Sequence, residues 1–156
     1  MKRPALLGVL LMAGLLVGSY SAWSDVRERR SGLRWALARE MAYHPERVWE
    51  WCPALYQRST LGPLPNELLP EVRELTVPRA VWWDWFRRHE SFSGTAAVEA
   101  SNLIGTGTCA LRVAFAATHQ YRDATVIARS PRFGTASVSH EPRHDYRIDE
   151  WHLAGR

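Results

Sequence analysis

Residues 140–144 contain the side chains in this chain that are best suited to metal chemistry. His140 and His144 are four positions apart, and Glu141 directly follows the first histidine. On a helix this spacing places two imidazoles on one face, where they can bind zinc while the carboxylate activates a water molecule. His140, Glu141 and His144 are therefore the candidate metal-site residues.

This H-E-x-x-H string resembles the zinc site of metalloproteases, and the resemblance covers these five residues. Pro142 departs from it, because a proline inside a helix clashes with the carbonyl group four residues earlier. The preceding T-A-S-V-S alternates as a strand does, and Arg147 and Glu150 replace the glycine and third histidine of the extended motif. The sequence favours a polar turn between two strands. A looser metal site would draw on the histidines and acids of residues 140–152.

Signals for other reactions are missing from the sequence. The G-T-G-T of residues 105–108 lacks the lysine of a phosphate-binding loop, and no G-x-S-x-G or C-x-x-C string occurs. The formal net charge is +4, with acidic residues interspersed among the arginines, which indicates a solvated surface rather than a nucleic-acid interface. We therefore expect no catalytic residues, no cofactor and no nucleic-acid partner.

Residues 4–24 form an uncharged run that follows Lys2 and Arg3. As a helix this run spans about 32 Å, close to the thickness of the hydrocarbon core of a bilayer. It also has the basic start and apolar centre of a signal peptide, with Ser19 and Ser21 before a cleavage position. Residues 1–24 are thus a retained membrane anchor or a cleaved signal peptide, and we favour the anchor.

The charged residues on the two sides of this run predict opposite orientations of the chain in the membrane. The arginines after the run disfavour export under the positive-inside rule, whereas a short basic N-terminus normally stays in the cytoplasm. We expect export, with the chain anchored in the inner membrane and facing the periplasm, or periplasmic or secreted if the run is cleaved. Gly14 and Gly18 have the spacing that lets two membrane helices approach closely, which would give a homo-oligomer.

The two cysteines, Cys52 and Cys109, lie outside the apolar run. In an oxidising compartment an even pair predicts a disulfide bond. Two buried free thiols are the other interpretation of the same residues.

Hydrophobic periodicity predicts a single α+β domain over residues 25–156, helical in residues 25–104 and β-rich in residues 105–156. An amphipathic helix over residues 25–43 continues the apolar run, with Leu33, Leu37 and Met41 on its inner face. We expect further helices at residues 45–56, 66–75, 78–90 and 96–104. Period-two alternation then predicts four strands of an antiparallel meander, at residues 109–116, 121–129, 135–140 and 146–153.

Tryptophans occur on both faces of the expected helices. Trp82, Trp85 and Phe86 share the inner face of the helix at residues 78–90, which indicates a place in the core. Trp83 and Trp51 fall on the polar faces of their helices and are the candidate contacts with a partner.

A hydrophobic N-terminal helix, its amphipathic continuation and a C-terminal antiparallel sheet resemble the general architecture of pilin-like subunits. The chain departs from them at Leu10, which stands where a glutamate is expected if cleavage followed Ala5. The sequence predicts a small exported, membrane-tethered envelope protein that acts as a structural or interaction module with a protein partner. The alternative is a periplasmic, metal-dependent hydrolase that uses residues 140–152.

Overall fold

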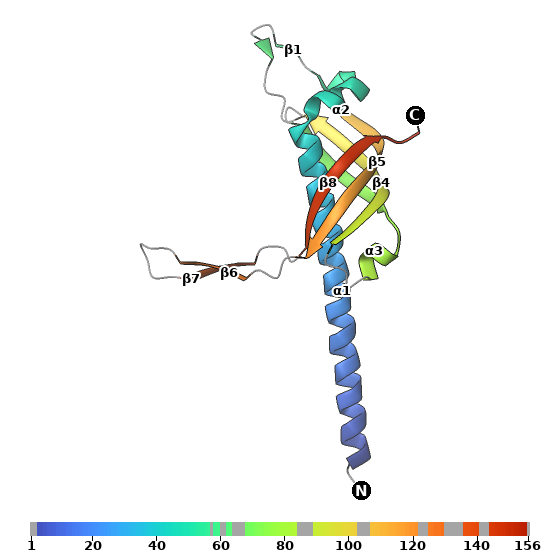
Figure 1. Cartoon of the computed structure of the whole chain (residues 1–156), viewed down its shortest axis with the longest axis vertical. Helices are drawn as coiled ribbons and strands as arrows, with labels where there is room; N and C mark the ends of the chain where they lie inside the picture. Colours follow the sequence, from blue (N-terminus) through green and yellow to red (C-terminus); the bar gives the residue numbers. More distant parts are fainter. Residues whose placement is uncertain are drawn as a thin grey trace.

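One long helix organises the molecule, and a sheet packs against its C-terminal half (Figure 1). The structure, a computed structural model, describes residues 3–56, 58–59, 62–63, 68–83, 89–102, 107–121, 125–129, 136–140 and 144–155. Helix α1 (Arg3–Tyr43) has 41 residues and therefore measures about 60 Å. Its described N-terminal part stands clear of the sheet, with large apolar side chains exposed.

The C-terminal half of α1 is amphipathic, as the sequence predicts. Leu33, Leu37 and Met41 are fully buried, whereas Arg30 and Arg34 are exposed. The buried residues recur every three or four positions and so form one stripe along the helix. Because no break separates this stripe from the apolar run, the anchor candidate and the core helix are one rigid element.

Four antiparallel strands in the order β3-β4-β5-β8 form the main sheet. They are β3 (Leu68–Thr76), β4 (His89–Asn102), β5 (Thr108–Tyr121) and β8 (His144–Leu153). Helix α1 lies on one face of this sheet and contacts both edge strands, β3 and β8. The inward-facing side chains of the two central strands alternate with exposed or half-buried ones and include several alanines, so the helix can approach the sheet closely.

The remaining elements are short. Strands β6 (Thr125–Arg129) and β7 (Ala136–His140) pair with each other in a second, two-stranded sheet, drawn beyond the main sheet in Figure 1. The others are α2 (Pro45–Trp51), the 3-10 helix η1 (Pro53–Leu55), α3 (Ala80–Trp83) and the pair β1 (Arg58–Ser59) and β2 (Gly62–Pro63).

The α+β class, the N-terminal helix and a four-stranded antiparallel sheet are confirmed, but the strands of that sheet differ from those expected. The predicted helix at residues 66–75 is wrong, because this segment contains β3, and the one at residues 96–104 is wrong, because β4 extends to Asn102. Within the predicted helix at residues 78–90, the described residues contain only α3 and the start of β4. Residues 25–104 therefore supply two strands of the main sheet, and β6 and β7 form their own sheet.

A disulfide bond joins Cys52 to Cys109, with 6.2 Å between their Cα atoms, so the predicted pairing is confirmed. It connects the end of α2 to the beginning of β5 across a sequence separation of 57 residues. The connection between helix and sheet is therefore covalent at the end of the domain far from the apolar run.

Reduction of this disulfide should lower the free energy of unfolding by about 4 kcal/mol, because the open chain regains the entropy of a long closed loop. Urea unfolding of the purified protein with and without reductant measures this difference. The Cys52→Ser/Cys109→Ser variant should match the reduced protein and show no response to reductant. Equal stability with and without reductant would contradict the prediction.

Candidate functional site

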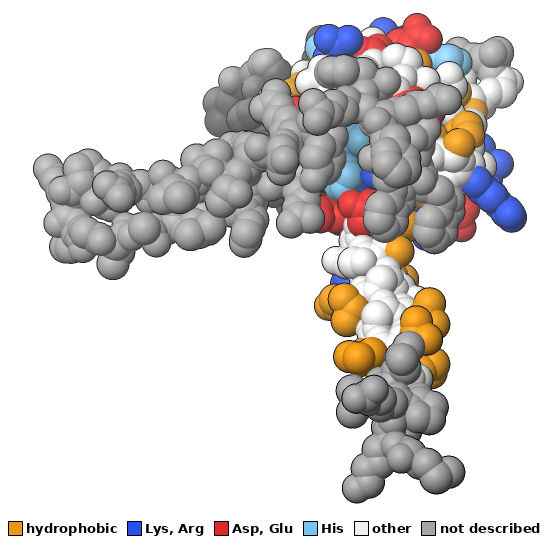
Figure 2. Space-filling model, turned by 60° about the horizontal axis from the view of Figure 1, so that its bottom comes forward, with side chains coloured by type: hydrophobic (Ala, Val, Ile, Leu, Met, Phe, Trp, Pro, Cys, Tyr) orange, Lys and Arg blue, Asp and Glu red, His pale blue; other side chains and the backbone are white. Residues whose placement is uncertain are grey.

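Three buried polar side chains and a half-buried carboxylate, from three elements, meet at the end of the sheet nearest the apolar run. Asp25 and Arg29 come from α1, His119 from β5 and His144 from β8. Arg29 and His119 are each 4% exposed and His144 is 1% exposed. Histidine and acidic side chains are visible where α1 enters the domain (Figure 2).

Each of these side chains is placed by the periodicity of its element. Asp25 and Arg29 are one helical turn apart and precede Leu33 on the buried stripe of α1. His119 continues the inward alternation of side chains along β5. His144 is the first residue of β8 and pairs with Tyr121, which lies two positions after His119 on β5. The two histidines are therefore diagonal neighbours on the face that the helix covers.

A chain of hydrogen bonds links the four side chains. His119 Nε2 lies 2.9 Å from His144 Nδ1, and His144 Nε2 lies 2.9 Å from Asp25 Oδ1. Arg29 Nε donates to Asp25 Oδ2 at 2.9 Å, and Arg29 Nη1 donates to the backbone carbonyl of Val81 at 3.2 Å. We call Asp25, Arg29, His119 and His144 the junction network.

The direction of these bonds follows from the carboxylate. An ionised Asp25 can only accept, so His144 Nε2–H must be the donor to it. In a neutral imidazole the other nitrogen is then an acceptor, and His119 Nε2–H must donate to His144 Nδ1. Both histidines are thus held in one tautomer, and protonating His144 would reverse its hydrogen bond with His119, whose Nε2 would then have to accept.

Burial keeps both imidazoles neutral. Burial, with repulsion from His144 when that ring is protonated and from Arg29, lowers the pKa of His119 from 6.5 to about 4. Burial also lowers the pKa of His144, and the hydrogen bond to Asp25 opposes this effect only in part. Neither ring carries a charge at neutral pH.

For the carboxyl group of Asp25, neighbouring groups together have a larger effect on the pKa than burial does. Burial alone would raise the pKa of Asp25, but the hydrogen bond from His144 and the charge of Arg29 outweigh it and hold the pKa below its ordinary value. The junction network therefore contains one ion pair, Asp25 with Arg29, beside two neutral imidazoles.

Aromatic packing encloses the histidines. The ring of His119 stacks between those of His144 and Tyr146, at centroid distances of 5.1 Å and 4.8 Å. Tyr146 is buried, which raises the pKa of its hydroxyl group, and Tyr146 Oη has no hydrogen-bond partner among the described residues. Gly32 allows this close packing, because a Cβ atom there would lie 3.3 Å from both His144 O and Tyr146 Cε2.

This arrangement suits a structural link better than a reaction centre. Both ring nitrogens of His144 are engaged within the domain. No group of three or more His, Cys, Asp or Glu side chains within the described part of the chain has metal-binding geometry. The chemistry available to the junction network is to hold α1 against β5 and β8 and to take up protons at acidic pH.

The residues of the H-E-x-x-H string separate in the structure. His140 ends β7 and His144 opens β8, so the string lies across two strands and not on one helix. Glu141 lies outside the described residues. The side chain of His140 also lies outside those described, and the contacts of His144 are with protein groups.

The other predicted site residues lie elsewhere. Trp51 is half-buried and packs edge-to-face against Trp151, with 5.3 Å between ring centroids. Trp83 ends α3, and its side chain lies outside those described, as do Trp85 and Phe86. Trp82 is buried in the core, as the sequence predicts. Gly14 and Gly18 face open space on the apolar run.

Sequence reasoning missed Asp25, Arg29, His119 and Tyr146 as members of a site. A signal for His119 existed, because the inward alternation of β5 from Leu111 through Phe115 extends to it. A polar residue on an apolar face needs a buried partner. The identity of that partner was not accessible, since Asp25 and His144 are 119 positions apart.

No protein-family model, no curated protein and no solved structure matches this chain.

Asp25→Asn should lower the free energy of unfolding by about 3 kcal/mol, because the buried Arg29 would lose its counter-ion. Urea unfolding at pH 7 measures the change. Glu40→Gln is the matched control on the same helix: its contact with His44 is solvent-accessible, so stability should change by less than about 1 kcal/mol. Similar losses in both variants would contradict a special role for Asp25.

Acidification should destabilise the fold between pH 6.5 and pH 4. Unfolded His119 binds a proton near pH 6.5 and folded His119 only near pH 4, so protons favour the unfolded state across this window. The loss from His119 is roughly 3 kcal/mol, and the lowered pKa of His144 adds in the same direction. Urea midpoints from pH 7 to pH 4 measure the slope, which His119→Gln should make shallower; an unchanged slope would exclude His119 as its source.

Proposed function

We propose that this chain is a small exported protein, tethered to the membrane by the first part of α1, whose α+β domain is a structural or interaction module of the cell envelope. The observation that carries the proposal is the continuity of α1. The helix passes without a break from an exposed apolar run into the buried core, and the junction network fixes it to the sheet at that point.

The tether is supported by the character of the N-terminal half of α1. The helix is long and apolar enough to cross a membrane, and its apolar window is unburied by the rest of the chain. Ser19 and Ser21 lie inside the helix and donate hydrogen bonds to the carbonyls of Leu15 and Gly18.

Export is supported by the disulfide bond. Structural disulfides persist in oxidising compartments and are rare in the reducing cytosol. The bond between Cys52 and Cys109 fits a domain on the outer side of the inner membrane.

A partner is supported by the outer face of α1, which we define as Trp35, Arg39 and Tyr43. Trp35 is 60% and Tyr43 is 72% exposed, and the Arg39 guanidinium lies 4.4 Å from the centre of the Trp35 ring. These three residues are spaced four apart, so they line one ridge of the helix on the side away from the sheet. Tryptophan, tyrosine and arginine are the residue types most enriched in binding hot spots.

The metal-dependent hydrolase, the alternative from the sequence, loses its main support in this geometry. It required His144 as a ligand, and both nitrogens of that ring are hydrogen-bonded within the domain. The interaction module uses His144 only to hold the domain on its helix.

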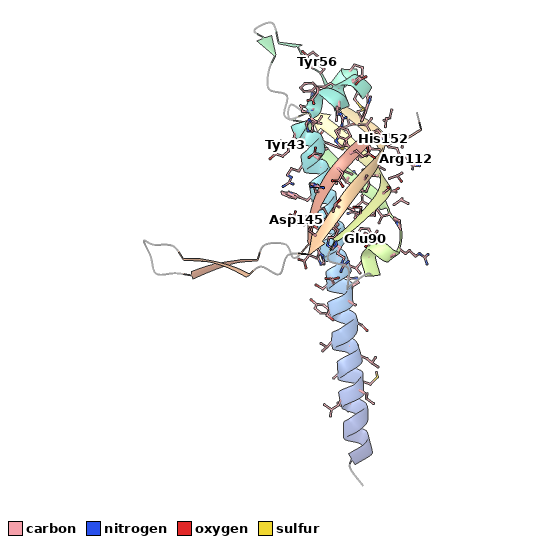
Figure 3. The ribbon with its side chains drawn as sticks, viewed as in Figure 1. Tyr43, Tyr56, Glu90, Arg112, Asp145 and His152 are labelled. Atoms are coloured by element: carbon pink, nitrogen blue, oxygen red, sulfur yellow. A yellow bond between two sulfur atoms is a disulfide. The ribbon has the colours of Figure 1, made fainter. Side chains whose placement is uncertain are left out.

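A photocrosslinking residue placed at Arg39 in living cells tests the proposal. We expect a single crosslinked adduct in the membrane fraction, and we expect Trp35→Ala/Tyr43→Ala to remove most of it, because those rings supply the apolar contact. The same residue at Arg112, on the opposite side of the domain from Tyr43, is the control and should give no adduct (Figure 3). Equal adducts at both positions, or a chain found only in the soluble fraction, would contradict the proposal.

A further inference from the structure

Two hollows on α1 meet at the point where the apolar run ends. The first has a volume of about 930 Å³ and is lined at its polar end by Arg27, Arg30 and Arg34. The second has a volume of about 540 Å³ and lies over Gly14, Leu15 and Gly18 in the apolar run. Both are lined by Ser19 and Ala22, so together they form one groove along the helix, apolar at one end and basic at the other.

The three arginines differ from several others in the domain. Arg29, Arg73 and Arg147 pair with carboxylates, whereas none of the described carboxylates forms an ion pair with Arg27, Arg30 or Arg34. Neighbouring aromatic rings and a backbone carbonyl group nevertheless hold these three guanidinium groups in place.

Each of the three has one contact that leaves most of its donors free. The guanidinium groups of Arg27 and Arg30 lie 5.4 Å from the ring centres of Trp23 and Trp82, respectively, and Arg34 Nη2 donates to Arg73 O at 3.3 Å. A guanidinium has five N–H donors, and a stacked one presents them at its edge. Three such groups along one groove form a site for an anionic oxygen cluster.

The depth of this site matches the headgroup layer of a bilayer. With Trp23 at the interface, Arg27, Arg30 and Arg34 lie about 6 Å, about 10 Å and about 16 Å further along the helix axis. Side chains on a helix tilt toward its N-terminus, which here is the direction of the membrane. Their guanidinium groups therefore reach back toward the phosphates, which lie just outside the hydrocarbon core.

We propose that this groove binds an anionic phospholipid. Its phosphodiester lies against Arg27 and Arg30, Arg34 lies beside the outer part of the headgroup, and one acyl chain lies in the hollow over Gly14, Leu15 and Gly18. A phospholipid fits because the groove changes from apolar to basic at the depth where such a molecule changes from acyl chain to phosphate. This inference rests on the proposed membrane tether.

The full-length protein in nanodiscs made from equal parts of phosphatidylglycerol and phosphatidylethanolamine tests the site. Native mass spectrometry of the released protein counts the lipids that stay bound. We expect phosphatidylglycerol to exceed phosphatidylethanolamine by roughly fivefold. The Arg27→Gln/Arg30→Gln/Arg34→Gln variant should retain the two lipids equally, and 10 mM inorganic phosphate should not displace the lipid from the unsubstituted protein.

The matched control, Arg39→Gln/Arg47→Gln/Arg112→Gln, removes the same charge from exposed positions outside the groove and should keep the excess. Loss of the excess in this control would mean that net charge alone selects the lipid, and would overturn the proposal. So would an unaltered excess in the groove variant, displacement by free phosphate, or a bound acidic protein in place of lipid. A chain that does not enter nanodiscs would refute the tether as well, whereas an embedded chain without lipid preference would refute the lipid site alone.

Discussion

The hydrogen bond from His144 to Asp25 is the interaction on which the rest of the arrangement depends. It joins the start of β8 to the first charged residue after the apolar run. Because Asp25 also neutralises the buried Arg29, α1 cannot slide or turn on the sheet without exposing a buried cation and two buried imidazoles. The orientation of the domain is therefore fixed relative to the apolar run, and a membrane around that run would orient the sheet as well.

The sequence predicts those parts of the fold whose periodicity is regular. The amphipathic half of α1 and the strand character of β5 and β8 follow from the spacing of apolar residues, whereas the pairing of the cysteines was expected from their even number in an oxidising compartment. Strand β3 was not recognised in the sequence because a bulge between Val72 and Glu74 makes Leu75 the next inward side chain. The apolar positions 68, 72 and 75 then acquire helical spacing. Strand β4 was not recognised because its buried face includes the small residues Ala96 and Ala100 and its outer face also carries an alanine, Ala97, so the two faces differ little in hydrophobicity.

The site could be predicted far less well than the fold. His144 was identified, but as a candidate metal ligand, because His140 and Glu141 precede it at the spacing of the H-E-x-x-H motif. Its actual partners, Asp25 and His119, are brought to it by the packing of α1 on the sheet and by the pairing of β5 with β8. A contact between residues more than a hundred positions apart produces no recognisable local sequence pattern. The H-E-x-x-H string is recognisable in the sequence even though Pro142 interrupts it.

The second sheet has a consequence for how this chain can vary. Tyr121 ends β5 and His144 opens β8, and the two are direct partners in the main sheet. The whole segment between them, which contains β6 and β7, thus begins and ends at one rung of the β5–β8 ladder. Its ends are held together by the main sheet, so a longer or shorter segment between them would leave the pairing of Tyr121 with His144 unchanged.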